Sequence, residues 1–114
     1  MSKLFYRFVD YLRYQTAIER AESEHNKQGK RFYVMPVTES KTPKLIIMDR
    51  KNFRMLKSKK YIDHKACLHT LMQESVYFTA HGNGSGFLDE EGKRKKYALY
   101  KSYCDAVRYG KRKQ

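Results

Sequence analysis

The stretch KLIIMDRKNFRMLKSKK, residues 44–60, changes its hydrophobic pattern halfway along, and this change indicates how the chain folds. Residues 44–48 include a short apolar run that is typical of a β-strand. Asp49 follows the run, and its carboxylate can accept hydrogen bonds from the free amide groups at the start of a helix. The stretch therefore predicts a strand, a cap at Asp49 and a helix over residues 50–58.

The segment before this stretch predicts a second strand that pairs with the first. RFYVMPVT, residues 31–38, is rich in residues that favour β-structure. The turn-forming residues ESKTP separate it from residues 44–48, a spacing that favours a β-hairpin. Pro36 has no amide hydrogen to donate, so we expect its strand at an edge of the sheet, or a bulge at Pro36 itself.

Residues 3–27 predict one long helix that is apolar on two sides. One face is formed by Phe5, Phe8, Val9 and Leu12. The opposite face is formed by Tyr11, Tyr14, Ile18 and Ala21. A helix of this kind either packs inside the fold on both sides or offers one side to a partner. The candidate partner face consists of Tyr11, Tyr14 and Ile18.

The remaining elements complete a mixed fold. Residues 64–74 predict a helix capped by Asp63, residues 75–80 a third strand, and residues 93–109 a final helix, with a glycine-rich loop at 81–86. The order α-β-β-α-α-β-α predicts an α+β fold, with a small, mainly antiparallel sheet covered by helices. We expect a single domain over residues 1–110 and a basic flexible tail over residues 111–114.

The chain carries a large excess of positive charge. Its formal net charge is +13 over 114 residues, while hydrophobic residues make up 40% of the sequence, enough to build a core. A small domain with this charge attracts polyanions, and nucleic acid is the commonest of them. An anionic membrane surface and an acidic protein are alternative partners, and solubility alone is the alternative that needs no partner.

Two basic centres supply the predicted nucleic-acid-binding residues. The first consists of Arg50, Lys51, Arg54, Lys57, Lys59 and Lys60, and the second of Lys93, Arg94, Lys95 and Lys96. Cations at the start of a helix oppose the helix dipole, so the second centre favours a role in binding phosphate, although the acidic residues 89–91 offset part of that cost. Several tyrosines adjoin basic residues, a pattern that suits single-stranded nucleic acid but also suits the margin of a core.

The sequence predicts no catalytic site, no metal site and no cofactor. His64, Cys67 and His69 do not all share a helix face, and zinc needs four convergent ligands. Asp49 and Asp63 are better explained as helix caps than as ligands of a catalytic metal. The loop HGNGSG has no strand–loop–helix context for binding nucleotide phosphates, and no small-molecule substrate is inferred.

The sequence also bears on the cellular location of the protein. No apolar run is long enough to span a membrane, and the start of the sequence lacks the features of a signal peptide. We expect a cytoplasmic protein in which Cys67 and Cys104 remain reduced and act as small apolar side chains on helix faces.

Two functions agree with these observations. The first is a small, non-catalytic protein that binds DNA or RNA mainly through the phosphate backbone. The second is a protein-interaction or regulatory module, which binds an acidic partner or self-associates through Tyr11, Tyr14 and Ile18. A single continuous positive face would favour the first function, and scattered charge beside an exposed aromatic helix face would favour the second.

Overall fold

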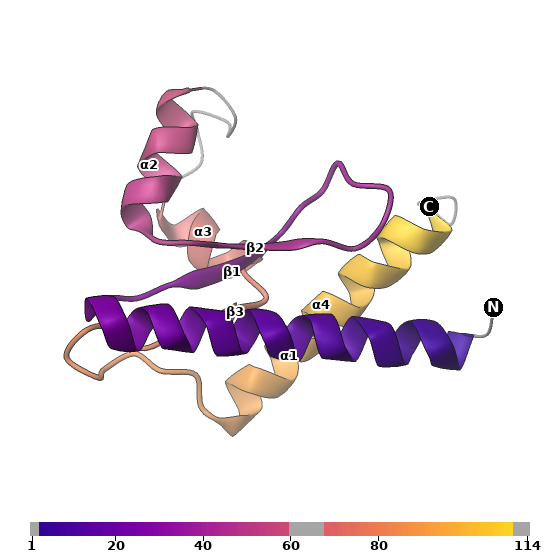
Figure 1. Cartoon of the computed structure of the whole chain (residues 1–114), viewed down its shortest axis with the longest axis horizontal. Helices are drawn as coiled ribbons and strands as arrows, with labels where there is room; N and C mark the ends of the chain where they lie inside the picture. Colours follow the sequence, from indigo (N-terminus) through magenta and orange to yellow (C-terminus); the bar gives the residue numbers. More distant parts are fainter. Residues whose placement is uncertain (1–2, 60–67, 111–114) are drawn as a thin grey trace.

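The computed structural model describes residues 3–59 and 68–110, and its elements follow the predicted order (Figure 1). They are α1 (Lys3–Gln28), β1 (Tyr33–Pro36), β2 (Leu45–Met48), α2 (Arg50–Ser58), α3 (Leu68–Glu74), β3 (Tyr77–Phe78) and α4 (Glu90–Tyr109). The α+β prediction is therefore confirmed. The predictions for Lys60, Asp63 and the tail over residues 111–114 lie outside the described residues.

The three strands form an antiparallel sheet in the order β2-β1-β3. The expectation of an edge strand at Pro36 is wrong, because β3 pairs with the other side of β1. The Val37 amide donates to the Lys44 carbonyl at 2.9 Å, so the nitrogen of Pro36 points away from β2. On that side β3 pairs only with Tyr33 and Val34. Pro36 thus lies beyond the paired segment, where a missing donor costs little.

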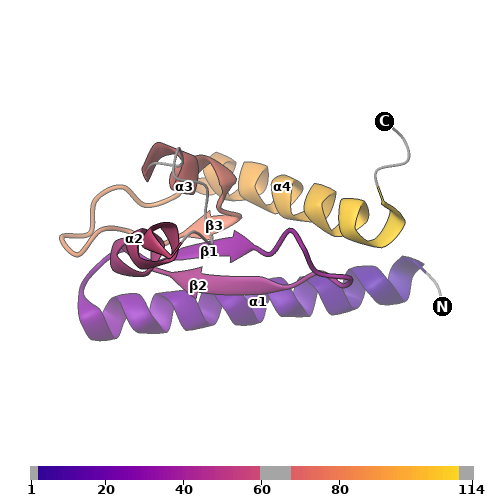
Figure 2. The same cartoon turned by 90° about the horizontal axis from the view of Figure 1, so that it is seen from above.

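The core has two parts, one on either side of β1. Val34 points into the first part, where Tyr14 of α1 packs against Tyr100 of α4, with 4.6 Å between the ring centres and 20° between the ring planes. Tyr33 points into the second part, which α2 and α3 cover with Phe53 and Leu71. In the view of Figure 2, α1 and α4 lie at opposite margins of the strands, and side chains of both helices pack with Val34 in the first part of the core. α1 and α4 meet beside the two-residue strand β3.

The predicted strand, cap and helix around Asp49 are confirmed. The Asn52 amide donates to Asp49 Oδ1 at 2.8 Å, and the Asp49 amide donates to the Asn52 side chain at 3.4 Å. Lys30 Nζ lies 2.7 Å from Asp49 Oδ2. Burial alone would raise the pKa of the Asp49 carboxyl, but Lys30 and the Asn52 amide outweigh burial and lower that pKa. Phe53 is buried one turn into α2, and it fixes the helix on the core.

The start of α4 differs from the prediction. The helix begins at Glu90 instead of residue 93, because Asp89 acts as its N-cap and accepts a hydrogen bond from the Gly92 amide at 2.7 Å. Glu90 and Glu91 occupy the first turn, where negative charge favours the helix dipole. The basic residues 93–96 follow that turn, so their placement does not oppose the dipole and is not by itself a sign of phosphate binding.

The hydropathy of the helices bears on membranes. Across residues 3–59 and 68–110, no helix combines the length and the apolar character that a membrane span requires.

Cys104 offers a test of the first part of the core. Cys104 lies on α4 with its side chain buried in this part of the core, and burial raises the pKa of its thiol to about 11. In a Cys67→Ser background, we expect iodoacetamide to modify Cys104 at least about a hundredfold more slowly in native buffer than in urea, because the thiolate is the reactive form. Mass spectrometry over time measures both rates. Equal rates in the two buffers would show that α4 does not bury this thiol against α1.

Candidate nucleic-acid interface

A hollow lined by tyrosines lies between α1 and the start of α4. Its volume is about 340 Å³. The lining residues are Tyr11, Tyr14, Gln15, Ile18, Tyr77, Glu90, Lys93, Arg94 and Tyr97. The structure therefore brings two separate predictions together, because Lys93 and Arg94 of the second basic centre adjoin the candidate partner face of α1.

Two of the tyrosines form a rigid floor. The Tyr14 hydroxyl donates to the Val76 carbonyl at 2.8 Å, and the Tyr77 hydroxyl donates to Glu22. Both side chains are buried, and burial raises the pKa of each phenol well above its usual value. Tyr14 is therefore part of the monomer core and is not available as a partner contact, and Ile18 is half-buried against the same core.

The other two tyrosines are accessible. Tyr11 is 45% exposed and Tyr97 is half-buried. Their ring centres lie 6.3 Å apart, and the ring planes meet at 84°. Lys101 Nζ lies 4.9 Å from the centre of the Tyr97 ring and covers part of it. The hollow thus has an exposed aromatic wall at Tyr11 and a second aromatic wall at Tyr97.

Charged side chains of both signs line the hollow. Lys93 and Arg94 are exposed on the second turn of α4. Glu90 is exposed one turn earlier and adds a carboxylate. Gln15 of α1 contributes an amide, which can both donate and accept hydrogen bonds. The hollow can therefore receive a planar, polar group and an anion next to it.

Lys96 does not line the hollow, unlike Lys93 and Arg94 of the same predicted centre. Its ammonium group donates to the carbonyls of Met72 at 2.7 Å and Ser75 at 2.6 Å, at the end of α3. Burial lowers the pKa of Lys96. The side chain holds the end of α3 against α4, because cations stabilise the free carbonyls at a helix C-terminus. Lys95, by contrast, is exposed and lies 3.6 Å from Glu91.

The first basic centre lies in a different part of the molecule. Figure 1 shows α2 above the sheet and the first turns of α4 below it. Arg50, Lys51, Arg54 and Lys59 are exposed on or beside α2, and Lys57 is half-buried. In this view the sheet therefore separates the two centres.

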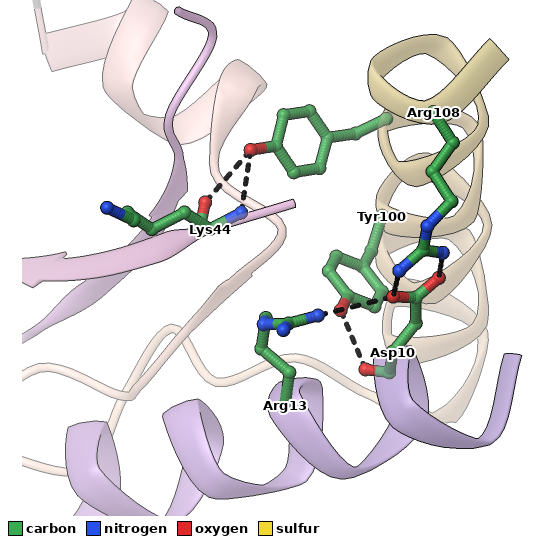
Figure 3. Close-up of polar contacts among 6 residues, drawn as sticks. Asp10, Arg13, Lys44, Tyr100 and Arg108 are labelled. Carbon is green, nitrogen blue, oxygen red and sulfur yellow. Dashed lines mark hydrogen bonds and ion pairs between the residues drawn. The ribbon is translucent and has the colours of Figure 1, made fainter. Parts of the chain in front are cut away.

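No pattern in the sequence predicted the contacts that hold α1 against α4 (Figure 3). Arg108 donates two hydrogen bonds to the Asp10 carboxylate, at 2.6 and 2.8 Å, and Arg13 lies 3.2 Å from the same carboxylate. The Tyr100 hydroxyl donates to the Asp10 carbonyl at 2.6 Å. These bonds fix the crossing of the two helices and so the shape of the hollow. Asp10 is the single acidic residue among residues 3–18, a signal that it has a specific partner.

Two further observations bear on the site. Within the described parts of the chain, no three His, Cys, Asp or Glu side chains are close enough to hold a metal ion, while His64 and Cys67 lie outside those parts. Searches of protein-family models, curated proteins and solved structures found no match to this chain. The geometry of the tyrosine hollow is therefore the basis for a functional proposal.

Proposed function

We propose that the protein binds single-stranded nucleic acid, with one unstacked base in the tyrosine hollow and the neighbouring phosphates at Lys93 and Arg94. The observation that carries the proposal is the lining of this hollow, where four tyrosines adjoin two exposed cations. Aromatic rings stack on the faces of bases, and cations follow the backbone of a single strand. A duplex keeps its bases stacked inside, so it has no group that enters such a hollow.

The polar lining suits the edge of a base. The Glu90 carboxylate can accept a hydrogen bond from an exocyclic amino group, and the Gln15 amide can pair with either kind of edge. The side chains of Tyr14 and Tyr77 are buried and their hydroxyls already have partners, so they shape the base of the hollow and offer no polar atoms. We expect stacking on Tyr11 to supply affinity, and Glu90 to favour bases that carry an amino group.

The first basic centre has a secondary role in this proposal. Lys51 and Arg54 are exposed on α2, across the sheet from the hollow, and they are available to phosphates of a longer strand. Phe53 holds α2 in place between them. Binding of short oligonucleotides should therefore depend on Lys93 and Arg94, and binding of long ones on both centres.

Two matched double reversals test the proposal. Lys93→Glu with Arg94→Glu and Lys51→Glu with Arg54→Glu lower the net charge equally, so they separate local contacts from overall charge. With short labelled single strands of DNA and RNA, we expect the first pair to weaken binding more than tenfold in fluorescence anisotropy. The dependence of log affinity on log salt should become shallower by about 1.4 units, since each phosphate contact on a single strand contributes about 0.7.

Stacking is tested separately with Tyr11→Ala. This side chain is exposed, so the variant should remain folded, and binding should weaken by about tenfold with an unchanged salt dependence. The proposal is wrong if both double reversals have the same effect on short strands, since overall charge would then explain the binding. Tighter binding to duplex than to single strands would also rule it out.

A further inference from the structure

The first half of α1 exposes an apolar stripe that the tyrosine hollow does not use. The stripe consists of Leu4, Phe5, Phe8 and Leu12. Leu4 is 77% exposed and Phe8 60%. The area that these four side chains expose together is on the order of 500 Å², which is comparable to the largest apolar patches on soluble monomers and often marks a binding surface.

The stripe is a local feature of α1 and not a property of the whole helix. Residues three or four apart share one side of a helix, so the four members lie along the side that faces away from buried Tyr14 and Ala21. The same side continues past Leu12 to Glu19 and Asn26, which are polar and exposed. Solvent therefore meets a polar surface on the second half of α1 and an apolar surface on the first.

A second hollow adjoins the stripe, between α1 and β2. Its volume is about 360 Å³. The lining residues are Val9, Leu12, Arg13, Thr16, Ala17, Arg20 and Leu45. Leu12 belongs to both features, so the stripe and the hollow form one continuous surface. Its lining includes no acidic residue and two arginines, of which Arg13 is paired with Asp10 and Arg20 is exposed. The surface thus combines apolar contact with positive charge at Arg20.

We infer that the stripe and this hollow form a docking surface for an acidic amphipathic helix of another protein. Apolar side chains of such a helix, spaced three and four residues apart, would pack on Phe8 and Leu12. A flanking Asp or Glu would reach Arg20, whose side chain is exposed at the hollow.

The shape and the charge of the surface decide against other occupants. A flat bilayer would cover the stripe but would leave the concave part beside Leu45 empty. A second copy of the chain, with a net charge of +13, would bring like charges together around Arg20. A helix with apolar and acidic faces would fill the hollow with apolar side chains and place a carboxylate near Arg20.

The test selects partners without assuming their sequence. A display library of random helix-length peptides is selected on the full chain, with Phe8→Ser as the counter-selection. We expect the enriched peptides to carry apolar residues spaced as on one side of a helix, flanked by Asp or Glu. A synthetic copy of an enriched peptide should bind Phe8→Ser and Arg20→Glu at least about tenfold more weakly than the natural chain.

Two controls accompany the selection. Lys27→Glu makes the same change in charge as Arg20→Glu at an exposed position of α1 outside the hollow, and it should leave peptide affinity within about twofold. Phe8→Ser should leave the binding of single-stranded nucleic acid unchanged, because Phe8 does not line the tyrosine hollow. Circular dichroism should show that Lys27→Glu and Phe8→Ser are both folded, since the side chains of Lys27 and Phe8 are exposed.

Four results would overturn the inference. The first is that no peptide is enriched on the natural chain over Phe8→Ser, and the second is that the enriched peptides lack acidic residues. The third is that Arg20→Glu and Lys27→Glu weaken peptide binding equally, and the fourth is that a different partner occupies the stripe. A membrane is the occupant if vesicles of phosphatidylserine and phosphatidylcholine bind the natural chain but not Phe8→Ser. A second copy is the occupant if sedimentation shows a dimer that Phe8→Ser dissociates.

Discussion

Tyr100→Ala should lower the free energy of unfolding by about 4 kcal/mol or more. The side chain is 0% exposed, and its ring stacks on Tyr14. Loss of a buried aromatic side chain costs about 3–5 kcal/mol, and the Asp10 carbonyl would lose its donor at a cost of about 1 kcal/mol more. Small domains have only about 5–15 kcal/mol of stability in total, so urea denaturation followed by circular dichroism should detect a large loss.

Two control variants separate the contribution of the buried Tyr100 ring from that of its hydroxyl and from the loss of an exposed tyrosine. Tyr100→Phe keeps the ring and removes only the hydroxyl, so it should cost about 1 kcal/mol. Tyr11→Ala removes an exposed tyrosine, so it should cost less than 1 kcal/mol. A Tyr100→Ala protein as stable as the Tyr11→Ala protein would show that α4 does not pack on α1 as described.

Asp10→Ala should lower the free energy of unfolding by about 3 kcal/mol, the second largest loss that we expect. The side chains of Asp10 and Arg108 are only 12% and 15% exposed. Without the carboxylate, the Arg108 guanidinium stays largely out of water and loses both of its hydrogen bonds to Asp10. The same urea denaturation measures the loss, and the loosened helix crossing should also weaken binding in the tyrosine hollow.

A double-mutant cycle tests whether the loss comes from the ion pair. Arg108→Met keeps an unbranched side chain near Tyr6, whose ring centre lies 4.3 Å from the guanidinium carbon. Combined with Asp10→Ala, it removes both charges, and much of the lost stability should return. We expect a coupling energy above about 1 kcal/mol. Strictly additive losses would mean that the pair does not stabilise the crossing.

The sequence predicted the parts of the fold that depend on neighbouring residues. The strand, the Asp49 cap and α2 follow one another directly, and the cap needs only Asn52, three residues further on. The position of β1 in the sheet depends instead on β3, which pairs with it from more than forty residues away. Pro36 predicted an edge strand, but β3 is only two residues long, so the end of β1 at Pro36 is unpaired on that side and tolerates proline.

The same distinction explains the candidate site. Lys93 and Arg94 were predicted as binding residues only because they belong to a run of basic residues, and both are exposed at the tyrosine hollow. Lys96 belongs to the same basic run, but its contact with Met72 and Ser75 depends on tertiary packing. The hollow itself requires α1 and α4 to cross, and that crossing depends on Asp10 and Arg108. A local sequence pattern cannot predict which carboxylate pairs with an arginine that is distant in the sequence.

The link between Asp10 and α4 also has a consequence for how the chain folds during synthesis. The bonds from Tyr100 and Arg108 to Asp10 close loops of 90 and 98 residues. Contacts so distant in sequence slow folding, because much of the chain must be ordered before they form. On the ribosome, α1 leaves the exit tunnel well before α4. Until α4 follows, the side of α1 that carries Tyr14 has no helix to pack on. Chaperones that bind apolar segments should therefore contact nascent chains that stop before residue 90.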